Sequence, residues 1–454
     1  MPSSSDVNPP AATDWRALSA KLQALGKGTD LIHEWPATEA VEVPLAMIAT
    51  PPDPETVSAI VREASRQAAP VYPLGGCTSL DYGLPAPRAG LGLDLSGLRR
   101  VIDYPARDMT MTVGAGISIA RLSEIMSGEN QRLPVDIAER DRATLGGAIA
   151  TNASGPRRFG FGTLRDYVIG IQAVDGLGTV YKAGGRVVKN VAGYDLCKLL
   201  VGSVGTLGVI TEITLKLRPQ AEASALVGAV VADGRTDQLD RLLAGLLTSR
   251  TRPVAIEVLN APAACELAAA LENPAWFAEV PRSGRLLLVG FEGTAAEVQW
   301  QRQRLREEWL GDDLPLWERA GQEAAPLWQL LTEFPTQPAA LTFKANLLSS
   351  RVPMFFRLCD GLPVRLASHA GNGIVTGHVH DVSDVQEAGR ILELIRQCAV
   401  LDKGNAIVLR CPADWKSELG VWGRPRGDWA LMERVRRKLD PHGILNPGRF
   451  VNGK

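Results

Sequence analysis

Long apolar runs, paired cysteines and an excess charge of one sign are all missing from this chain of 454 residues. No apolar stretch approaches the length of a membrane span, and the N-terminus has neither the basic start nor the apolar centre of a signal peptide. Lysine and arginine number 49 against 50 aspartate and glutamate, so nothing favours a nucleic-acid or anionic-membrane surface. These absences predict a globular cytoplasmic protein with no transmembrane segment and no nucleic-acid partner.

Cysteine and histidine are both sparse in the places where metal or redox chemistry would need them. The six cysteines are scattered and none forms a CxxC pair, so the chain is predicted to hold no iron–sulfur cluster and no Cys-rich zinc site. Between His33 and His369 there is no histidine at all. Any relay of electrons through clusters would therefore need another protein.

The two common nucleotide-binding motifs are absent as well. The nearest approach to GxGxxG is "VGAGISIARL", which has Gly114 and Gly116 but Ile119 in place of the third glycine. The close approach of helix and strand that this glycine permits is then lost. No glycine-rich loop ends in Lys-Ser/Thr, so a P-loop is excluded too.

What is present is a chain of mixed helix and strand patterns. A helix is predicted at Trp15–Leu25 and another from Pro54, with Asp53 as its N-cap. A third helix should start near Ser118, and strand pairs should fill 168–184 and 204–219. The pattern suggests four parts, namely a leader and helix at 1–42, a first domain at 43–219, a second at 220–430 and a tail at 431–454.

Two glycine-rich stretches stand out in the first domain, "PLGGCTSLDYG" at 73–83 and "TLGGAIATNASG" at 144–155. The second one matches neither the helical nor the strand spacing of apolar residues, so it is predicted to be a loop. Glycines let backbone N–H groups face one concavity and let a large anion approach without meeting a Cβ. Each stretch alone could be a tight turn, but the two together favour a phosphate-bearing ligand.

The order of motifs resembles the vanillyl-alcohol-oxidase/PCMH flavoprotein family, and within it the glycolate oxidase and D-lactate dehydrogenase branch. After "PLGGCTSLDYG" come "LPVDIAERDRATLGGAIATNASGPRRFGFGTLRDYVIG", "VVKNVAGYDLCKLLVGSVGTLGVITEITLKLRP" and "LDPHGILNPGRF". The resemblance implies an α+β fold, with a PCMH-type FAD-binding domain of two α+β subdomains and an α/β C-terminal cap domain. It also implies FAD as the cofactor.

The same resemblance implies which residues contact FAD. The expected cofactor-binding residues are Gly75, Gly76, Thr78, Ser79 and Gly83 around the pyrophosphate, and Pro134, Asp136, Thr144, Gly146, Gly147, Thr151, Asn152, Ser154, Gly155, Val209 and Ile210 along the rest of the cofactor. Cys77 replaces a glycine that the family usually has, which leaves a cysteinyl–flavin bond as an alternative. Because the first domain has no histidine to form a histidyl–flavin bond, FAD is predicted to bind noncovalently.

Three of the five histidines lie in "SHAGNGIVTGHVH", namely His369, His378 and His380. The stretch resembles a GH-x-GDGN-x-H motif whose histidines, in active relatives, bind a divalent metal or act as a base. The Asp of that motif is missing here, and no Glu-His-Gly segment follows it. The three histidines are thus the catalytic candidates, ordinary structural histidines are the competing interpretation, and no metal site is predicted. Lys189 and Arg158 are candidates to meet a substrate carboxylate.

Two functions remain open at this point. The first is the FAD subunit of a glycolate oxidase-like complex that oxidises a 2-hydroxy acid, glycolate or D-lactate, to the 2-oxo acid. The second is a non-catalytic flavin scaffold or electron-transfer subunit beside a paralogous catalytic subunit. Either function implies a paralogous flavin subunit and an iron–sulfur subunit as partners, and a cytoplasmic location with attachment to the inner membrane only through those partners. A reductase of the MurB type shares the fold, but no sugar-nucleotide or nicotinamide signature supports it.

Overall fold

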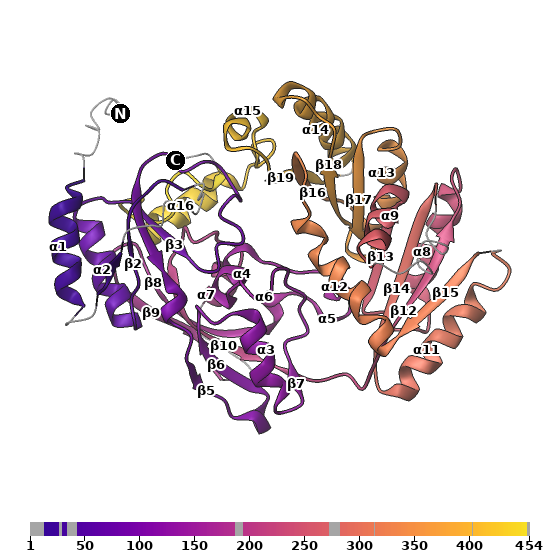
Figure 1. Ribbon diagram of the computed structural model, residues 1–454, viewed down its shortest axis with the longest axis horizontal. Coiled ribbons are helices and arrows are strands. Elements are labelled where there is room, and N and C mark those ends of the chain that lie inside the picture. Colours follow the sequence, from indigo (N-terminus) through magenta and orange to yellow (C-terminus); the bar gives the residue numbers. More distant parts are fainter. Residues whose placement is uncertain are drawn as a thin grey trace.

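The computed structural model describes residues 13–26, 30–33, 43–186, 194–271, 282–312, 314–401 and 403–451. The leader up to residue 12 and Lys189 lie outside these ranges. In Figure 1 the N-terminal half, coloured indigo and purple, lies beside a second half in red and orange. The last helix, α16 (Trp429–Leu439), returns to the side of the first half.

The first sheet has the strand order β1-β2-β4-β3, and its members are β1 (Ile32–His33), β2 (Leu45–Ala49), β4 (Gly90–Asp94) and β3 (Val71–Leu74). Helices α1 (Trp15–Leu25) and α2 (Pro54–Arg66) pack with it. The side chain of Asp53 accepts the N–H of Thr56 at 2.7 Å, so α2 begins where its N-cap predicts. The apolar side of α2 is fully buried, so this side of the helix packs into the core of the first sheet.

The second sheet is antiparallel, with the order β5-β6-β10-β8-β9. Its strands are β5 (Val101–Asp103), β6 (Thr110–Gly114), β10 (Val209–Lys216), β8 (Val168–Val174) and β9 (Val180–Gly184). The hairpin of β8 and β9 confirms the predicted pair at 168–184. The pair predicted at 204–219 is wrong, because β10 lies between β6 and β8 and takes both neighbours from elsewhere in the chain. Beyond it, the short β11 (Arg218–Pro219) pairs with β7 (Gln131–Arg132).

The second glycine-rich stretch is not a loop but begins with a helix, α4 (Leu145–Thr151). Thr144 caps it, with Oγ1 accepting the N–H of Gly147 at 3.3 Å. A Cβ on Gly146 would lie 2.9 Å from the Cβ of Ala115, so the helix backbone packs directly against the end of β6. Gly146 therefore allows a close contact between α4 and β6, which the spacing of apolar residues in the sequence does not reveal. Three other short helices line this region, α3 (Ile119–Ser127), α5 (Arg158–Phe161) and α6 (Leu164–Tyr167), and α7 (Leu196–Leu200) covers the sheet edge.

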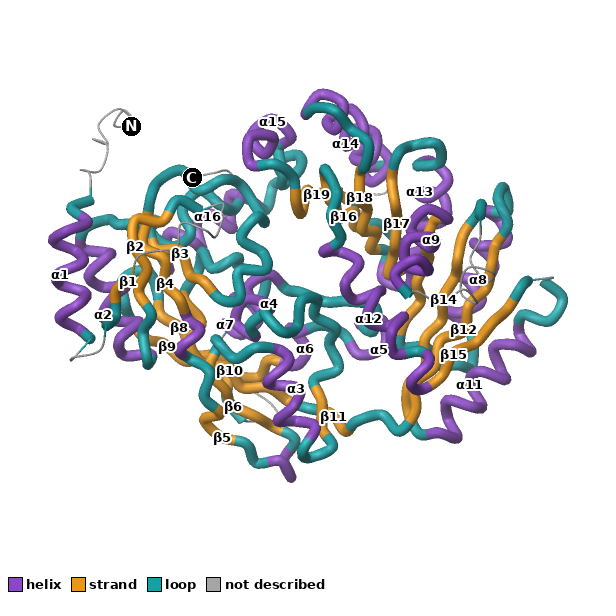
Figure 2. The backbone as a smooth tube through the Cα atoms, viewed as in Figure 1, coloured by secondary structure: helices purple, strands orange, loops and turns teal. Residues whose placement is uncertain are grey.

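The second half, which we call the cap, is built on an eight-stranded sheet that is antiparallel in every recorded pair. In spatial order its strands are β15 (Leu316–Ala320), β12 (Ala223–Val231), β14 (Arg285–Gly293), β13 (Ala255–Asn260), β17 (Val364–His369), β18 (Ile374–Val379), β16 (Leu341–Asn346) and β19 (Asn405–Arg410). Figure 2 shows helices along both faces of this sheet.

The cap helices divide between two apolar cores. One core contains residues of α8 (Thr236–Thr248), α11 (Ala295–Glu308), α13 (Val352–Leu358) and α14 (Val385–Val400). The other contains residues of α9 (Ala261–Ala270) and α12 (Ala325–Glu333). Alternate residues of β12 enter opposite cores, as the pleat of a strand buried on both faces requires.

The C-terminal tail returns to the first sheet. Val71 of β3 donates its N–H to Ile444 O at 2.8 Å, and Asn446 donates its N–H to Val71 O at 2.9 Å. The carboxylate of Asp440 accepts the N–H groups of Ile444 and Leu445 at 3.1 and 2.8 Å, which stops α16 and turns the chain. The short helix α15 (Lys416–Leu419) lies between the cap sheet and this tail.

Candidate active site

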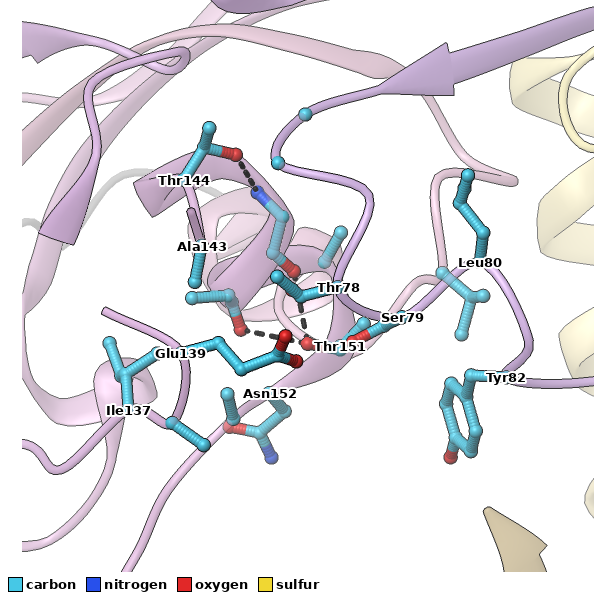
Figure 3. Close-up of a pocket in the computed structure, with 18 of the residues that line it drawn as sticks. Thr78, Ser79, Leu80, Tyr82, Ile137, Glu139, Ala143, Thr144, Thr151 and Asn152 are labelled. Atoms are coloured by element: carbon cyan, nitrogen blue, oxygen red, sulfur yellow. Dashed lines mark hydrogen bonds between the residues drawn. The ribbon is translucent and has the colours of Figure 1, made fainter. Parts of the chain in front are cut away.

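A cavity of about 290 Å³ lies where the first half meets the cap. Its walls come from the loop after β3, from 137–144 and α4, from the loop before β10, and from the cap strands β16 to β19. Figure 3 shows Thr78 and Ser79 of the first loop together with Thr144, Thr151 and Asn152 of the α4 region around this space. Segments far apart in sequence thus form one continuous site.

Arg157 fixes the two halves relative to each other beside the cavity. Its guanidinium contacts Asp136 of the first half at 2.5 Å and Glu292 of the cap at 2.6 Å. It also lies 3.9 Å from the ring centroid of Trp328 on α12, a cation–π distance. Arg132 adds a second ion pair to Glu292 at 2.6 Å. These largely buried contacts keep the cap against the first half.

Most of the predicted cofactor residues line this cavity. They are Gly75, Gly76, Thr78, Ser79, Thr144, Gly146, Gly147, Thr151, Asn152, Ser154 and Ile210. Five others lie behind its wall. Asp136 holds Arg157, Gly155 packs against Asp136, Gly83 packs against Arg449 O, and Pro134 and Val209 are buried.

The shape and the donors of the cavity fit a dinucleotide. A Cβ on Gly76 would lie 1.8 Å from Arg142 O, so the first loop packs backbone to backbone on the segment before α4. A Cβ on Gly147 would instead meet only Thr144 Oγ1, at 3.2 Å, and this exposed glycine presents bare backbone to the cavity. The buried Oδ1 of Asn152 has no hydrogen-bond partner within the described residues. Backbone, hydroxyl and amide groups together suit phosphates, a polyol chain and a heterocycle.

The three candidate histidines do not come together in the cavity. His369, at the end of β17, lines it. His378 is fully buried behind it, where Nε2 donates to Phe334 O at 2.8 Å and Nδ1 accepts from Thr342 Oγ1 at 3.0 Å. Burial lowers the pKa of His378 to about 4. His380 contacts Arg365 at 2.8 Å outside the cavity lining.

A charged cluster surrounds His369. Its Nδ1 lies 2.9 Å from both carboxylate oxygens of Glu257, which is directly opposite it in the β13–β17 pair. Burial raises the pKa of Glu257, and His369 opposes that rise. Nδ1 is therefore occupied, and Nε2 is the nitrogen left to face a ligand.

Two cations complete this end of the cavity. Burial lowers the pKa of Lys344 to about 8, with a further contribution from Arg158. Arg158 donates to Ser154 Oγ at 2.8 Å, while its buried Nε has no partner within the described residues. Neither cation forms an ion pair with a described residue. Sequence reasoning named Arg158 but missed Lys344 and Glu257, because a lysine or glutamate in a strand pattern normally faces solvent.

Comparison with known proteins identifies the class. Residues 44–184 match the family model of a FAD binding domain, and residues 422–450 match the C-terminal domain of FAD linked oxidases. Among solved structures, p-cresol methylhydroxylase with substrate bound superposes with a TM-score of 0.72 at 15% identity, covering 98% of each chain. An alkyldihydroxyacetonephosphate synthase superposes with a TM-score of 0.71 at 16% identity, over 97% of this chain and 86% of the synthase. The protein has the fold of PCMH-type flavoproteins, and its cofactor is FAD.

Sequence relatives narrow the class to a family. The D-2-hydroxyglutarate dehydrogenase of Xanthomonas citri pv. viticola is 31% identical over 93% of this chain and 91% of its own. The glycolate oxidase subunit GlcD of Bacillus subtilis is 30% identical over 92% of both chains. The mitochondrial D-lactate dehydrogenase [cytochrome] of Arabidopsis thaliana is 29% identical over 94% of this chain and 76% of its own. The chain belongs to this family of FAD-linked oxidoreductases.

The described helices include none that is long and apolar enough to cross a membrane.

Proposed function

We propose that the protein oxidises a small 2-hydroxy acid to the 2-oxo acid with noncovalently bound FAD. The observation that carries the proposal is the pair of cavity cations, Lys344 and Arg158, beside a histidine held by a carboxylate. Two partly buried cations that face the same cavity repel each other, and an anion bound between them removes that cost. A substrate carboxylate supplies that anion, and the relatives named for 2-hydroxy acids support this substrate class.

In the proposed reaction the chain binds, orients and deprotonates the substrate. Lys344 and Arg158 hold the carboxylate, so the neighbouring hydroxyl carbon has a fixed position. His369 Nε2 takes the hydroxyl proton, while Glu257 at Nδ1 keeps the ring in the tautomer that leaves Nε2 unprotonated. FAD, when bound, supplies the two-electron acceptor for the hydride of that carbon.

A second function is favoured by the histidines. His378 and His380 do not line the cavity, so the motif that resembles the family's catalytic histidines is only partly assembled here. The alternative is a flavin scaffold or electron-transfer subunit beside a paralogous catalytic subunit. In both cases we propose a paralogous flavin subunit and an iron–sulfur subunit as partners, in the cytoplasm, with contact to the inner membrane only through them.

Anaerobic titration of the isolated, FAD-loaded chain with glycolate or D-lactate separates the two. Bleaching of the oxidised flavin absorbance supports catalysis by this chain, and His369→Ala should then abolish bleaching while FAD content stays unchanged. Bleaching only after partner subunits are added, with no effect of His369→Ala, supports the scaffold. His380→Ala is the matched control, because His380 lies outside the cavity lining.

A further inference from the structure

Three cations of the C-terminal part of the chain hold the loop at 78–82, and two of them, Arg410 and Arg449, also line the cavity. Arg410 Nη2 donates to Thr78 O at 3.0 Å, and Lys416 Nζ donates to Asp81 O at 2.6 Å. Arg449 Nη2 donates to Leu80 O and, at 2.8 Å, to Tyr82 O. Tyr82 itself donates its N–H to Ser79 O at 3.1 Å. Every carbonyl oxygen of this five-residue loop therefore has a hydrogen-bond donor.

Holding the carbonyls also fixes the N–H groups of the loop. A trans peptide is planar, so the C=O of one residue and the N–H of the next point in opposite directions. When a cation holds Thr78 O, the N–H of Ser79 must face the other side of the chain. The loop thus keeps a single orientation of its N–H dipoles, which is what an anion site made of backbone requires.

The three cations are placed by different elements. Arg410 ends β19 of the cap, Lys416 begins α15, and Arg449 lies in the tail after α16. Lys416 is 1% exposed and Arg449 is 3% exposed. Buried cations at this depth need oxygen partners, and the loop carbonyls are such partners. Loop and C-terminal segments therefore stabilise each other.

Arg410 additionally connects the loop to the rest of the cavity. Its Nε lies 2.9 Å from Asp81 Oδ2, its Nη2 lies 3.6 Å from Glu139 Oε2, and its Nη1 donates to Thr336 O at 3.2 Å. Figure 3 shows the loop residues Leu80 and Tyr82 on one side of the site and Glu139 on another. Arg410 thereby joins the loop, the segment before α4 and the cap.

We propose that Arg410, Lys416 and Arg449 form a carbonyl clamp that sets the loop at 78–82 to receive the pyrophosphate of FAD, so that cofactor retention depends on the C-terminal segments. Lys416, which does not line the cavity, is a positioning residue, and Arg410 and Arg449 hold the loop carbonyls from the cavity wall. The proposal rests on the assignment of Thr78 and Ser79 to the cofactor site, and it adds the device that gives this loop its shape.

The test compares Arg410→Met with Arg424→Met in apoprotein titrated with FAD, with binding followed by flavin fluorescence. Arg424 is also in the C-terminal part, but it is exposed and pairs with Glu393, at 2.6 Å. Loss of the clamp should raise the dissociation constant of FAD by about tenfold or more, whereas Arg424→Met should leave it within about twofold. ADP carries the pyrophosphate without the flavin. Its affinity for Arg410→Met, measured by competition with FAD, should fall by a similar factor.

Arg410→Lys is a second variant, to be used if Arg410→Met does not fold. It keeps the positive charge but loses the planar set of N–H donors of the guanidinium. It should raise the dissociation constant measurably, by more than about twofold, with an apoprotein unfolding midpoint equal to that of Arg424→Met. An unchanged FAD affinity in a folded Arg410 variant, or an equal loss in Arg424→Met, would overturn the clamp. Wild-type apoprotein that binds no FAD would instead refute the cofactor site itself.

Discussion

Neighbouring glycines of α4 should respond in opposite ways to the same added methyl group. In Gly147→Ala the new Cβ meets only Thr144 Oγ1, at 3.2 Å, and otherwise enters the cavity. Alanine is more favourable than glycine in a helix by about 1 kcal/mol, so the apoprotein should be as stable as wild type or gain up to about that amount. A methyl forced against the bound cofactor should cost about 1–3 kcal/mol, which weakens FAD binding about five- to a hundredfold.

Gly146→Ala is the matched variant, because its Cβ would lie 2.9 Å from Ala115 Cβ and 3.0 Å from Ala115 O. That contact is inside the protein, so the apoprotein itself should lose about 1–3 kcal/mol of unfolding free energy. Urea unfolding of both apoproteins and fluorescence titration with FAD measure the two effects separately. If Gly147→Ala binds FAD as tightly as wild type, this side of α4 does not contact the cofactor. The bulkier Gly147→Val should be purified without flavin.

Three further predictions follow from the same site. Acid precipitation should release the yellow FAD into the supernatant, whereas colour kept in the pellet would indicate a bond to Cys77. The KM for the 2-hydroxy acid should rise as pH increases through about 8, because Lys344 then loses its proton and its charge, and Lys344→Met should raise KM and remove this pH dependence. His378 has a folded pKa near 4, below its usual 6.5, so the unfolded chain binds the proton first and stability should fall by about 3 kcal/mol between those two pH values. In His378→Ala the loss of stability between pH 6.5 and about 4 should disappear, and the stability at neutral pH should drop. Turnover per bound FAD should change little. A thousandfold loss of turnover would assign His378 to catalysis.

The amino-acid sequence by itself determined the local elements and the class of the protein. Asp53 followed by Pro54 marks the start of α2, and Ser118 marks the start of α3, because capping depends on residues a few positions apart. The two glycine-rich stretches favoured a phosphate-bearing ligand, because bare backbone beside a large ligand is visible in composition, and the resemblance of the ordered motifs to a known family indicated FAD.

Only the tertiary structure decided which residues meet. Gly146 in α4 packs against Ala115, and β10 pairs with β6 and β8 instead of forming a hairpin within 204–219. Both contacts are made by segments distant in the chain. The three histidines share one short stretch, yet His369 ends β17, His378 lies within β18 and His380 follows β18, so their surroundings differ. Glu257 reaches His369 only through strand pairing, and Arg410 reaches Thr78 across more than three hundred residues of sequence. Contacts of this kind arise from packing of whole sheets and helices, and no local spacing encodes them.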